Sequence, residues 1–345
     1  MKQFYINGSG RPINVENYQT FLVTGAAGFI GSYVTLQLLQ SGRKVIALDD
    51  LSTGSLSNLA AAQSFPNFEF INAKMPSEAP EVIAAFKRAD FVLHFAARVG
   101  VELVINSPTE LMVNNLLSTE QAARLCLEYS VPIIISSSSE VYGKRERDCL
   151  SEGDYSYLPH PGLLRWAYSI SKISDEFIIH DYKRRGLRAI IGRYFNFIGP
   201  GQSGDYGMVV PRFVRQAISG KPITVYGDGS QRRTFCDVRD GARAILGLVE
   251  NFDRLSAREW IAYNVGGTRD CSILELAEII KECTGSDSTV EFIPISALPC
   301  GFDEIYKRKP NCELIQLAVG WEPKFDLRAT IRDIIKSYAY EPIYD

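Results

Sequence analysis

Histidine is scarce in this chain of 345 residues, and its cysteines show no pairing pattern. The three histidines, His94, His160 and His180, stand far apart without the spacing of metal ligands. The cysteines are odd in number and include no CxxC pair; they are Cys126, Cys149, Cys236, Cys271, Cys283, Cys300 and Cys312. Both observations argue against a zinc site and a disulfide framework. We therefore expect no metal, and reduced thiols that are mostly buried as small apolar side chains.

The chain also lacks long apolar runs and a large excess of charge of either sign. No apolar run approaches the roughly 20 residues of a membrane helix, and residues 1–20 lack the apolar core of a secretory signal. The 37 Lys and Arg residues nearly balance the 40 Asp and Glu residues, for a formal net charge of -3. We therefore expect a cytoplasmic, globular protein without a membrane or nucleic-acid partner.

Short apolar runs alternate with helical stretches through the first 200 residues. The strand candidates are 21–23, 45–48, 68–71, 91–95, 133–136 and 188–192, and the helical stretches are 29–39, 78–87, 108–129 and 165–185. Because parallel strands need crossover helices, this order predicts an α/β fold with a Rossmann-type doubly wound parallel sheet.

The sequence pattern changes after Gly199-Pro200-Gly201: the predicted helices and strands become shorter, and glycine turns become more frequent. This change predicts a smaller C-terminal α/β substrate-binding lobe over residues 200–345, with some segments that return to the first domain. The first domain is expected over residues 20–199. Residues 1–19 show no clear period, so we interpret them as an N-terminal extension.

The segment TGAAGFIGS, residues 24–32, places three glycines directly after a strand and at a helix start. Glycine there permits a tight turn and a close approach of the backbone to a pyrophosphate, while the helix N-terminus favours negative charge. About twenty residues on, the second strand ends in Asp49-Asp50, which suits an adenosine ribose and repels a 2′-phosphate. The pattern favours NAD over NADP; the alternative is a glycine turn without a ligand. The expected contacts are Gly25, Ala27, Gly28, Phe29, Ile30, Gly31, Asp49, Asp50 and Ser52.

Tyr168 and Lys172 form a Tyr-x-x-x-Lys pair within RWAYSISKISDEF, which has the pattern of a helix. Their spacing puts both side chains on one helical face, where the lysine charge stabilises tyrosinate and makes the phenol a usable base. Since this spacing is common by chance, the pair alone is also compatible with a solvated helix face.

A hydroxyl-rich segment, SSSSEVYG at residues 136–143, follows the strand candidate that contains Ile133–Ile135. A serine at such a strand end can hydrogen-bond a reacting oxygen, and Glu140 adds an acid or base beside it. For Ser136 and Ser137 a serine-rich turn is the alternative.

Together these segments resemble the extended short-chain dehydrogenase/reductase family, the NAD-dependent nucleotide-sugar epimerases, dehydratases and decarboxylases. The resemblance runs from about Phe21 to the end of the chain. Besides the segments above, it is carried by HFAA at 94–97, NNLLST around Asn115, RYFNFIGPGQ at 193–202, VVPRFV at 209–214, YGDGSQRRTF at 226–235, RKP at 308–310 and GWEPK at 320–324. It implies a Rossmann domain with a small C-terminal lobe, and a homodimer formed through the helices at 108–129 and 165–185.

The resemblance also implies individual roles. Tyr168 corresponds to the base that oxidises a sugar hydroxyl, Lys172 to its partner and a ribose contact, and Ser138 to the hydroxyl that binds the sugar. Further cofactor contacts are Ala96 and Asn115, and the implied substrate contacts are Arg98, Ser139, Asn196, Val210, Arg212, Tyr226, Arg233 and Arg308. A surface ion pair is the alternative for Arg308. The family's usual acid after the third strand is missing, since that segment is Phe70-Ile71-Asn72-Ala73-Lys74.

The details of the motifs are most similar to UDP-glucuronic acid decarboxylases, through Ser138, Ser139, Glu140, Arg165, Trp166, Tyr168, Lys172 and Arg233. This likeness implies oxidation at C4 of UDP-glucuronate, with NAD, and decarboxylation to UDP-xylose or the 4-keto pentose. Arg233 is expected to bind the carboxylate, Arg98 is a weaker candidate, and Glu140 is expected to assist proton transfer at C5. The alternatives are a UDP-sugar or UDP-uronate 4-epimerase, a nucleotide-sugar dehydratase, and a non-catalytic NAD-binding regulator.

Overall fold

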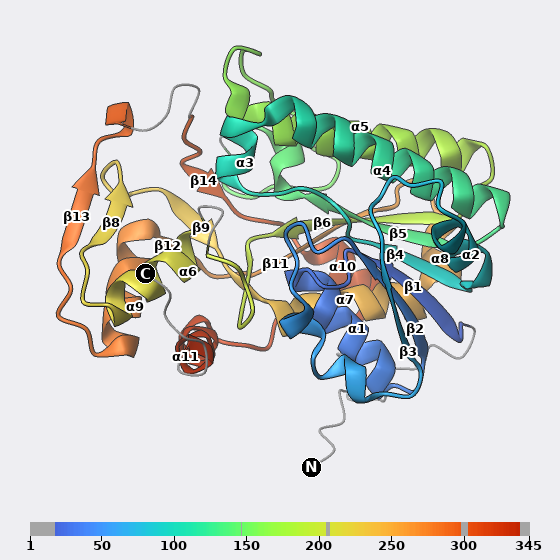
Figure 1. The fold of residues 1–345 in the computed structure, drawn as a ribbon. Helices are drawn as coiled ribbons and strands as arrows, with labels where there is room; N and C mark the ends of the chain where they lie inside the picture. The colour runs from blue at the N-terminus through green and yellow to red at the C-terminus, as the bar shows by residue number, and fades with distance from the viewer. Residues whose placement is uncertain (1–17, 146, 205–207, 298–302, 339–345) are drawn as a thin grey trace.

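A seven-stranded parallel sheet forms the centre of the computed structural model, which describes residues 18–145, 147–204, 208–297 and 303–338. The strand order is β11-β6-β5-β4-β1-β2-β3 (Figure 1). The strands are β1 (Thr20–Thr24), β2 (Lys44–Asp49), β3 (Phe68–Asn72), β4 (Phe91–His94), β5 (Ile133–Ser138), β6 (Ala189–Phe195) and β11 (Ala262–Gly266). This order confirms the predicted Rossmann-type fold, and its direction reverses between β1 and β4, where such sheets bind ligands. Of the predicted extension at residues 1–19, residues 1–17 lie outside the described residues, and Tyr18 is buried against the main domain.

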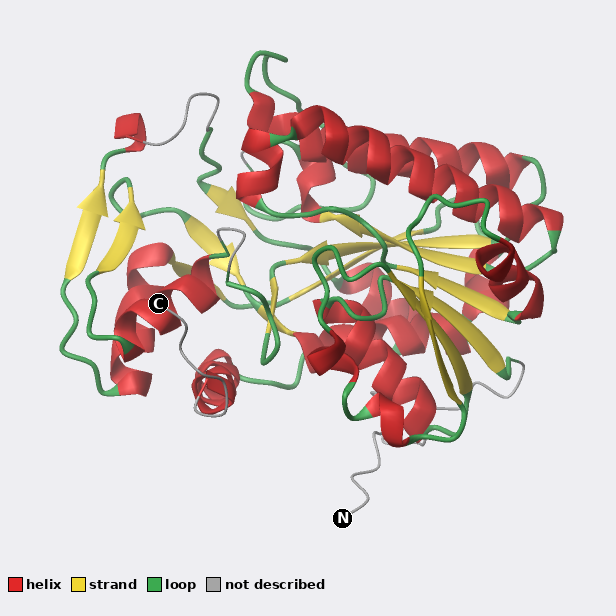
Figure 2. Cartoon of the chain, viewed as in Figure 1, coloured by secondary structure: helices red, strands yellow, loops and turns green. Residues whose placement is uncertain are grey.

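Helices cover both faces of the sheet, as Figure 2 shows. One face carries α1 (Phe29–Gln40), α7 (Val238–Glu250), α8 (Phe252–Ser256) and α10 (Glu313–Val319), and the other carries α2 (Pro80–Arg88), α4 (Pro108–Glu128) and α5 (Ala167–Arg184). Because strand side chains alternate, Phe21 and Val23 pack into the first core and Leu22 into the second. Each such buried side chain stabilises the fold by about 1.5–3 kcal/mol.

A smaller lobe surrounds a third core beside the sheet. Its elements are α6 (Val209–Ile218), β8 (Ile223–Tyr226), β9 (Arg232–Thr234), β12 (Asp270–Ser272), α9 (Ile273–Thr284), β13 (Val290–Ile293), β14 (Lys307–Arg308) and α11 (Leu327–Tyr338). A capping box between Ser272 and Glu275 begins α9, and Gly285 ends it in the left-handed conformation.

Two short strands, β7 (Phe197–Ile198) and β10 (Cys236–Asp237), pair where the chain passes between the sheet and the lobe. From the second half of the chain, α7 and α10 pack against the main sheet, and β11 is one of its strands. The division of the chain at residues 199 and 200 stays a prediction. The remaining short helices are α3 (Val101–Asn106) and single turns at Leu56–Leu59, Ala62–Ser64, Ser139–Tyr142, Leu164–Trp166 and Ile295–Ala297.

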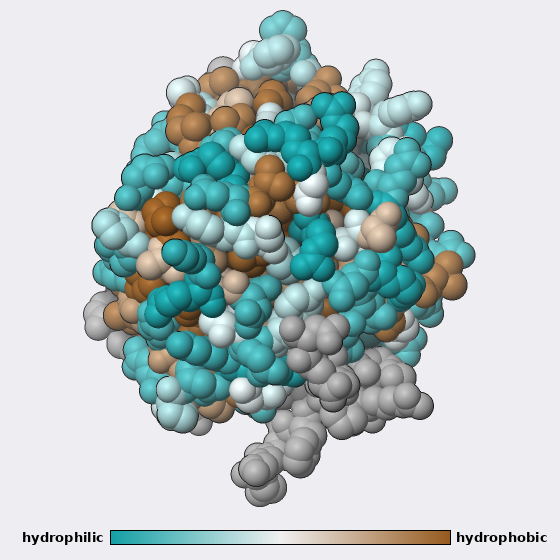
Figure 3. Space-filling view, turned by 90° about the vertical axis from the view of Figure 1, so that its right-hand side faces the viewer, coloured by the Kyte–Doolittle hydropathy of each residue, from teal (hydrophilic) through white to brown (hydrophobic). Residues whose placement is uncertain are grey.

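Polar side chains cover most of the face that Figure 3 shows, with small groups of apolar side chains between them. Within the described ranges, no helix has the length and apolar character needed to cross a membrane. The six cysteines among these residues are free, and Cys126, Cys236 and Cys271 are buried; Cys300 lies outside the described residues.

Candidate active site

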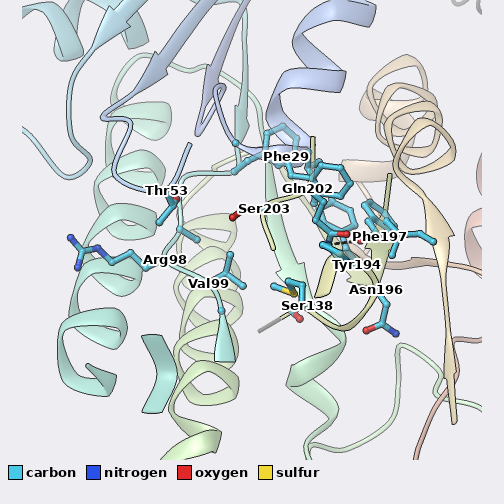
Figure 4. Close-up of a pocket in the computed structure, with 18 of the residues that line it drawn as sticks. Phe29, Thr53, Arg98, Val99, Ser138, Tyr194, Asn196, Phe197, Gln202 and Ser203 are labelled. Atoms are coloured by element: carbon cyan, nitrogen blue, oxygen red, sulfur yellow. Dashed lines mark hydrogen bonds between the residues drawn. The ribbon is translucent and has the colours of Figure 1, made fainter. Parts of the chain in front are cut away.

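A cavity of about 910 Å³ lies at the carboxyl ends of the main strands and extends to the smaller lobe (Figure 4). It brings together the residues that the sequence predicted for the cofactor, the catalytic group and the substrate. Three of the predicted residues, Ala27, Asn115 and Lys172, are buried and do not line it. Those that do are Gly25, Gly28, Phe29, Ile30, Gly31, Asp49, Asp50, Ser52, Ala96, Arg98, Ser138, Ser139, Glu140, Tyr168, Asn196, Val210, Arg212, Tyr226, Arg233 and Arg308.

The glycine turn between β1 and α1 leaves no room for side chains at two positions. A Cβ on Gly25 would lie 2.7 Å from the amide nitrogen of Ala96, and one on Gly31 would lie 2.1 Å from the carbonyl oxygen of Gly25. Gly28 precedes α1 without a side-chain cap, so N–H groups of the first turn remain available to an anion. This arrangement fits the pyrophosphate of a dinucleotide.

Asp49, at the end of β2, is the carboxylate fixed beside the glycine turn. Its Oδ2 accepts a hydrogen bond from the Ala27 amide at 2.9 Å, and its Oδ1 accepts one from the Leu51 amide at 2.8 Å. Burial raises the pKa of Asp49, and these two hydrogen bonds counteract the shift. Asp50 is exposed and accepts hydrogen bonds from the amide and hydroxyl of Ser52. The geometry therefore favours Asp49 as the ribose-binding carboxylate.

The cavity wall next to β3 is apolar where the resemblance implies an acid. Ala73 and Met75 line the cavity there, and Met75 is buried. The Ala73 amide donates a hydrogen bond to the carbonyl oxygen of Asp49 at 3.2 Å, which fixes this wall relative to Asp49. At this position an adenine ring would therefore contact apolar side chains instead of a carboxylate.

The α5 helix places Tyr168 in the cavity wall and Lys172 one turn further on, behind the wall. The Ser138 side chain, at the end of β5, lowers the pKa of Tyr168. The Lys172 ammonium donates to the carbonyl oxygen of Ser136 and to the carboxylate of Asp175, both at 3.0 Å. Burial raises the pKa of Tyr168, and the charge of Lys172 is the main influence that lowers it. The charge of Lys172 therefore acts on the Tyr168 phenol, and the catalytic role of the pair stays a prediction.

Glu140 is held by three side-chain donors from two segments of the chain. Arg165 binds it through two nitrogens, at 2.7 and 3.1 Å, Arg308 donates to its Oε1, and the Ser169 hydroxyl donates to its Oε2 at 3.1 Å. Burial alone would raise the pKa of Glu140, but the two guanidinium groups outweigh it and hold this pKa well below its usual value. Glu140 therefore stays ionised and ties these segments together.

A third guanidinium, that of Arg233, lines the same wall. It forms an ion pair with Glu304 at 2.9 Å, and burial together with the nearby charge of Arg308 lowers its pKa to about 10. The Nε of Arg308 is buried without a hydrogen-bond partner among the described residues. Arg165, Arg233 and Arg308 thus form a cationic wall, a name we keep for these three residues.

Two acidic side chains near the cationic wall, those of Asp303 and Glu304, were not predicted from the sequence. Glu304 pairs with Arg233, while Asp303 pairs with Lys144 at 2.6 Å and accepts a hydrogen bond from the Trp166 indole at 3.2 Å. Asp303 and Glu304 both line the cavity. The sequence clue to these two acids is that Glu304 and Asp303 precede Arg308 by four and five residues in the same segment.

The lobe side of the cavity contains the remaining predicted substrate contacts. The Arg212 guanidinium stacks over the ring of Tyr226, 4.3 Å from its centroid, and burial lowers the pKa of Arg212. Asn196 has a positive φ of 40° and its amide donates to the carbonyl oxygen of Thr234 at 2.9 Å. Val210 lines the cavity nearby. A flat ring and an anionic group would both find complementary surface here.

The Arg98 guanidinium points away from two other predicted substrate contacts, Ser138 and Asn196, as Figure 4 shows. It forms an ion pair with Glu110. Asn115 fixes the local backbone, because its amide accepts from the nitrogen of Arg98 at 2.7 Å and donates to its carbonyl oxygen at 3.0 Å. The structure therefore separates the Arg98 charge from the cationic wall.

Comparison with known proteins gives a consistent family. Residues 21–266 match the family described as "NAD dependent epimerase/dehydratase family". UDP-glucuronic acid decarboxylase 1 of Arabidopsis thaliana is 32% identical over 318 residues, which are 92% of this chain and 69% of that relative. UDP-N-acetyl-alpha-D-glucosaminuronate decarboxylase of Bacillus cytotoxicus is 31% identical over 318 residues, 91% of this chain and 96% of that relative.

The solved structures of similar fold include a UDP-glucuronic acid 4-epimerase from Bacillus cereus, in complex with UDP-glucuronic acid and NAD. It is 25% identical, with a TM-score of 0.81, and the alignment covers 93% of this chain and 99% of that one. The fold, the ordered motifs and the sequence match agree with the resemblance that the sequence showed. This chain belongs to the NAD dependent epimerase/dehydratase family.

Proposed function

We propose that this chain binds NAD at the glycine turn and decarboxylates UDP-glucuronate to UDP-xylose or the 4-keto pentose. The observation that carries this proposal is the cationic wall of Arg165, Arg233 and Arg308, which lines the same cavity as Tyr168 and Ser138. A uronate carboxylate and a diphosphate are both anions that guanidinium groups bind well. The relative named UDP-glucuronic acid decarboxylase 1 supports the same activity, and the relative named for UDP-N-acetyl-alpha-D-glucosaminuronate supports decarboxylation of a UDP-linked uronate.

Tyr168 is the proposed base for the C4 hydroxyl. When bound, NAD supplies a hydride acceptor for this carbon and a hydride donor for the return step. The C4 ketone makes the C6 carboxylate that of a β-keto acid, so the C5–C6 bond breaks, carbon dioxide leaves, and the electron pair enters an enolate. Tyr168 and Ser138 hydrogen-bond the enolate oxygen, and a proton is then taken up at C5.

The charges around Glu140 suit an anionic sugar. Arg233 is the proposed carboxylate ligand, and the substrate competes there with Glu304 for the guanidinium. Since Arg165 and Arg308 hold Glu140 ionised and its pKa low, its carboxylate carries no proton to give to C5 and is suited to position these cations. The assistance of Glu140 in the proton transfer at C5 is therefore proposed to be indirect, through the position of the two guanidinium groups.

A 4-epimerase is the second candidate, because the solved structures of similar fold include the UDP-glucuronic acid 4-epimerase of Bacillus cereus. Both reactions begin with the same oxidation at C4, and they differ in whether the carbon–carbon bond of the ketone breaks before reduction. The same cavity residues, Tyr168, Lys172 and Ser138, would serve either reaction.

The test is the product mass after incubation of the protein with NAD and UDP-glucuronate. Loss of the mass of carbon dioxide supports a decarboxylase that forms UDP-xylose, and loss of carbon dioxide and two hydrogens supports one that releases the 4-keto pentose with NADH. An isomer of unchanged mass supports the epimerase, and loss of water supports a dehydratase. A panel of UDP-, dTDP-, GDP- and CDP-sugars identifies the base and the sugar. The Tyr168→Phe variant is the control, and a wild type without product from any of these sugars contradicts the enzymatic proposal.

We also propose that two copies of this chain pair through α4 and α5. These helices expose Val113, Leu117 and Phe177, of which 51%, 44% and 73% of the surface is accessible. Large apolar side chains so exposed on adjacent helices favour an interface. Light scattering of the wild type and of Phe177→Glu tests this proposal: we expect a dimer for the first and a monomer for the second, and a monomeric wild type contradicts it.

A further inference from the structure

A buried carboxylate, Asp175, contacts the lysine of the Tyr168 pair. Its Oδ2 lies 3.0 Å from the Lys172 Nζ, and the two side chains are 0% and 4% exposed. Asp175 follows Lys172 by three residues on α5, so both side chains lie on the same face of that helix. The Thr119 side chain, on the neighbouring α4, lowers the pKa of Asp175, and the Asp175 Oδ1 is buried without a hydrogen-bond partner among the described residues. Asp175 lies within the segment RWAYSISKISDEF, but the sequence pattern predicted no role for it.

The ion pair with Asp175 affects both the pKa of the Lys172 ammonium group and the direction of its hydrogen bonds. Burial is the largest single influence and lowers the pKa of Lys172, but the charge and hydrogen bond of Asp175, together with Tyr168 and Glu176, outweigh it and raise this pKa above its usual value. Ser136 and Asp175 each accept one of the three ammonium protons. One donor position is left for the cavity side, where Tyr168 lies.

Other charges around Lys172 and Tyr168 are compensated within the protein. The titratable groups that face this pair are Asp175 and Glu176 of α5, His94 of β4 and Glu140 of the turn after β5. Glu176 is paired with Arg193 at 2.7 Å, and Glu140 with two guanidinium groups. Burial, with a contribution from Lys172, lowers the pKa of His94 to about 3, which leaves its ring neutral. Asp175 is therefore the counter-ion of Lys172.

We propose that Asp175 is a positioning residue that keeps the buried Lys172 charged and oriented, so that Lys172 can support Tyr168 as the base. This inference rests on the role of Tyr168 in the proposed function. Without the carboxylate, Lys172 loses its proton at a lower pH. Tyr168 ionises at a lower pH as well, since the negative charge of Asp175 no longer opposes its ionisation. In a profile of kcat/KM against pH, ionisation of Tyr168 sets the acid limb and deprotonation of Lys172 sets the alkaline limb. Both limbs therefore move to lower pH.

The first test needs no substrate. In protein labelled with [15N]lysine, the Lys172 Nζ resonance is assigned by its loss in Lys172→Met and followed as a function of pH. We expect it to titrate about 1–3 pH units lower in Asp175→Asn than in the wild type. The matched control is Asp181→Asn, which breaks an exposed ion pair of the same spacing on α5, with Arg184 at 2.9 Å. An equal titration of Lys172 in the Asp175 variant and the wild type overturns the inference.

The second test is the pH profile of kcat/KM on whichever nucleotide sugar the wild type converts. Asp175→Asn is expected to move both limbs to lower pH by about one unit or more, and Asp175→Glu to restore part of this shift. An unchanged profile overturns the inference. If Asp175→Asn does not fold, Asp175→Ser replaces it, because it removes the same charge with a smaller polar side chain. An unshifted Lys172 titration in Asp175→Ser then overturns the inference.

The two tests separate this inference from the proposed function. A shifted Lys172 titration in a protein that converts no nucleotide sugar supports the ion pair and contradicts the enzymatic proposal. An unshifted titration in an active protein overturns the role of Asp175 alone.

Discussion

Glu140→Gln is expected to destabilise the protein by more than any comparable change at the surface. The substitution keeps the shape of the side chain but removes the negative charge that Arg165 and Arg308 share. The side chains of these two arginines are 17% and 5% exposed, so water replaces little of the lost interaction. Two guanidinium groups are then left buried without their counter-ion.

The magnitude follows from the burial of this cluster. Removing one member of a buried ion pair costs about 3–5 kcal/mol, because the partner's charge stays desolvated. An exposed pair contributes only about 0.2–1 kcal/mol. Since the pKa of Glu140 is lowered in the folded state, its contribution is present above the ordinary value of 4.5 and is lost as the pH falls toward the folded-state pKa. The difference between variant and wild type should therefore shrink in acid.

Urea unfolding at neutral pH, without nucleotide sugar, measures the difference in the free energy of unfolding. Glu69→Gln is the matched control, because Glu69 also binds an arginine through two nitrogens, those of Arg88 at 2.6 and 3.1 Å, but on the surface. We expect a loss of about 3 kcal/mol or more for Glu140→Gln and below about 1 kcal/mol for the control. Equal losses in the two variants would refute the reasoning.

Three further predictions concern the cavity. Tyr168→Phe should lower turnover by about 10²–10⁴-fold while calorimetry finds NAD binding unchanged; full turnover would contradict its role as the base. Gly31→Ala should weaken NAD binding, since its Cβ would lie 2.1 Å from the Gly25 carbonyl oxygen, whereas Gly153→Ala, which meets open space, should bind as the wild type does; equal affinities would be evidence against the glycine turn as the site. Arg233→Met should raise the KM for a UDP-uronate roughly tenfold or more, since a hydrogen bond to a charged group contributes about 1.5–3 kcal/mol, with a smaller effect on neutral UDP-sugars; equal effects would remove Arg233 as the carboxylate ligand.

The local pattern of the sequence determined the main sheet and its helices. Every predicted strand up to 188–192 has a counterpart, from β1 to β6, because alternating or continuous apolar runs report directly on burial. The glycine turn and the Tyr168–Lys172 spacing were readable for the same reason, since both depend on residues within one turn or one helix. The place of β11 beside β6 was not readable, because a short apolar run does not specify its partner strand.

Only the tertiary structure decided which charges meet at the site. Arg308 binds Glu140 across 168 positions of sequence, and Arg233 reaches Glu304 across 71. Sequence reasoning proposed these arginines as substrate ligands, but their acidic partners come from segments whose proximity depends on how the lobe packs against the sheet. Even Asp175, three residues from Lys172, acquires its importance from burial. The interaction of two charges depends on their distance and their exposure to water, and spacing along the chain specifies neither.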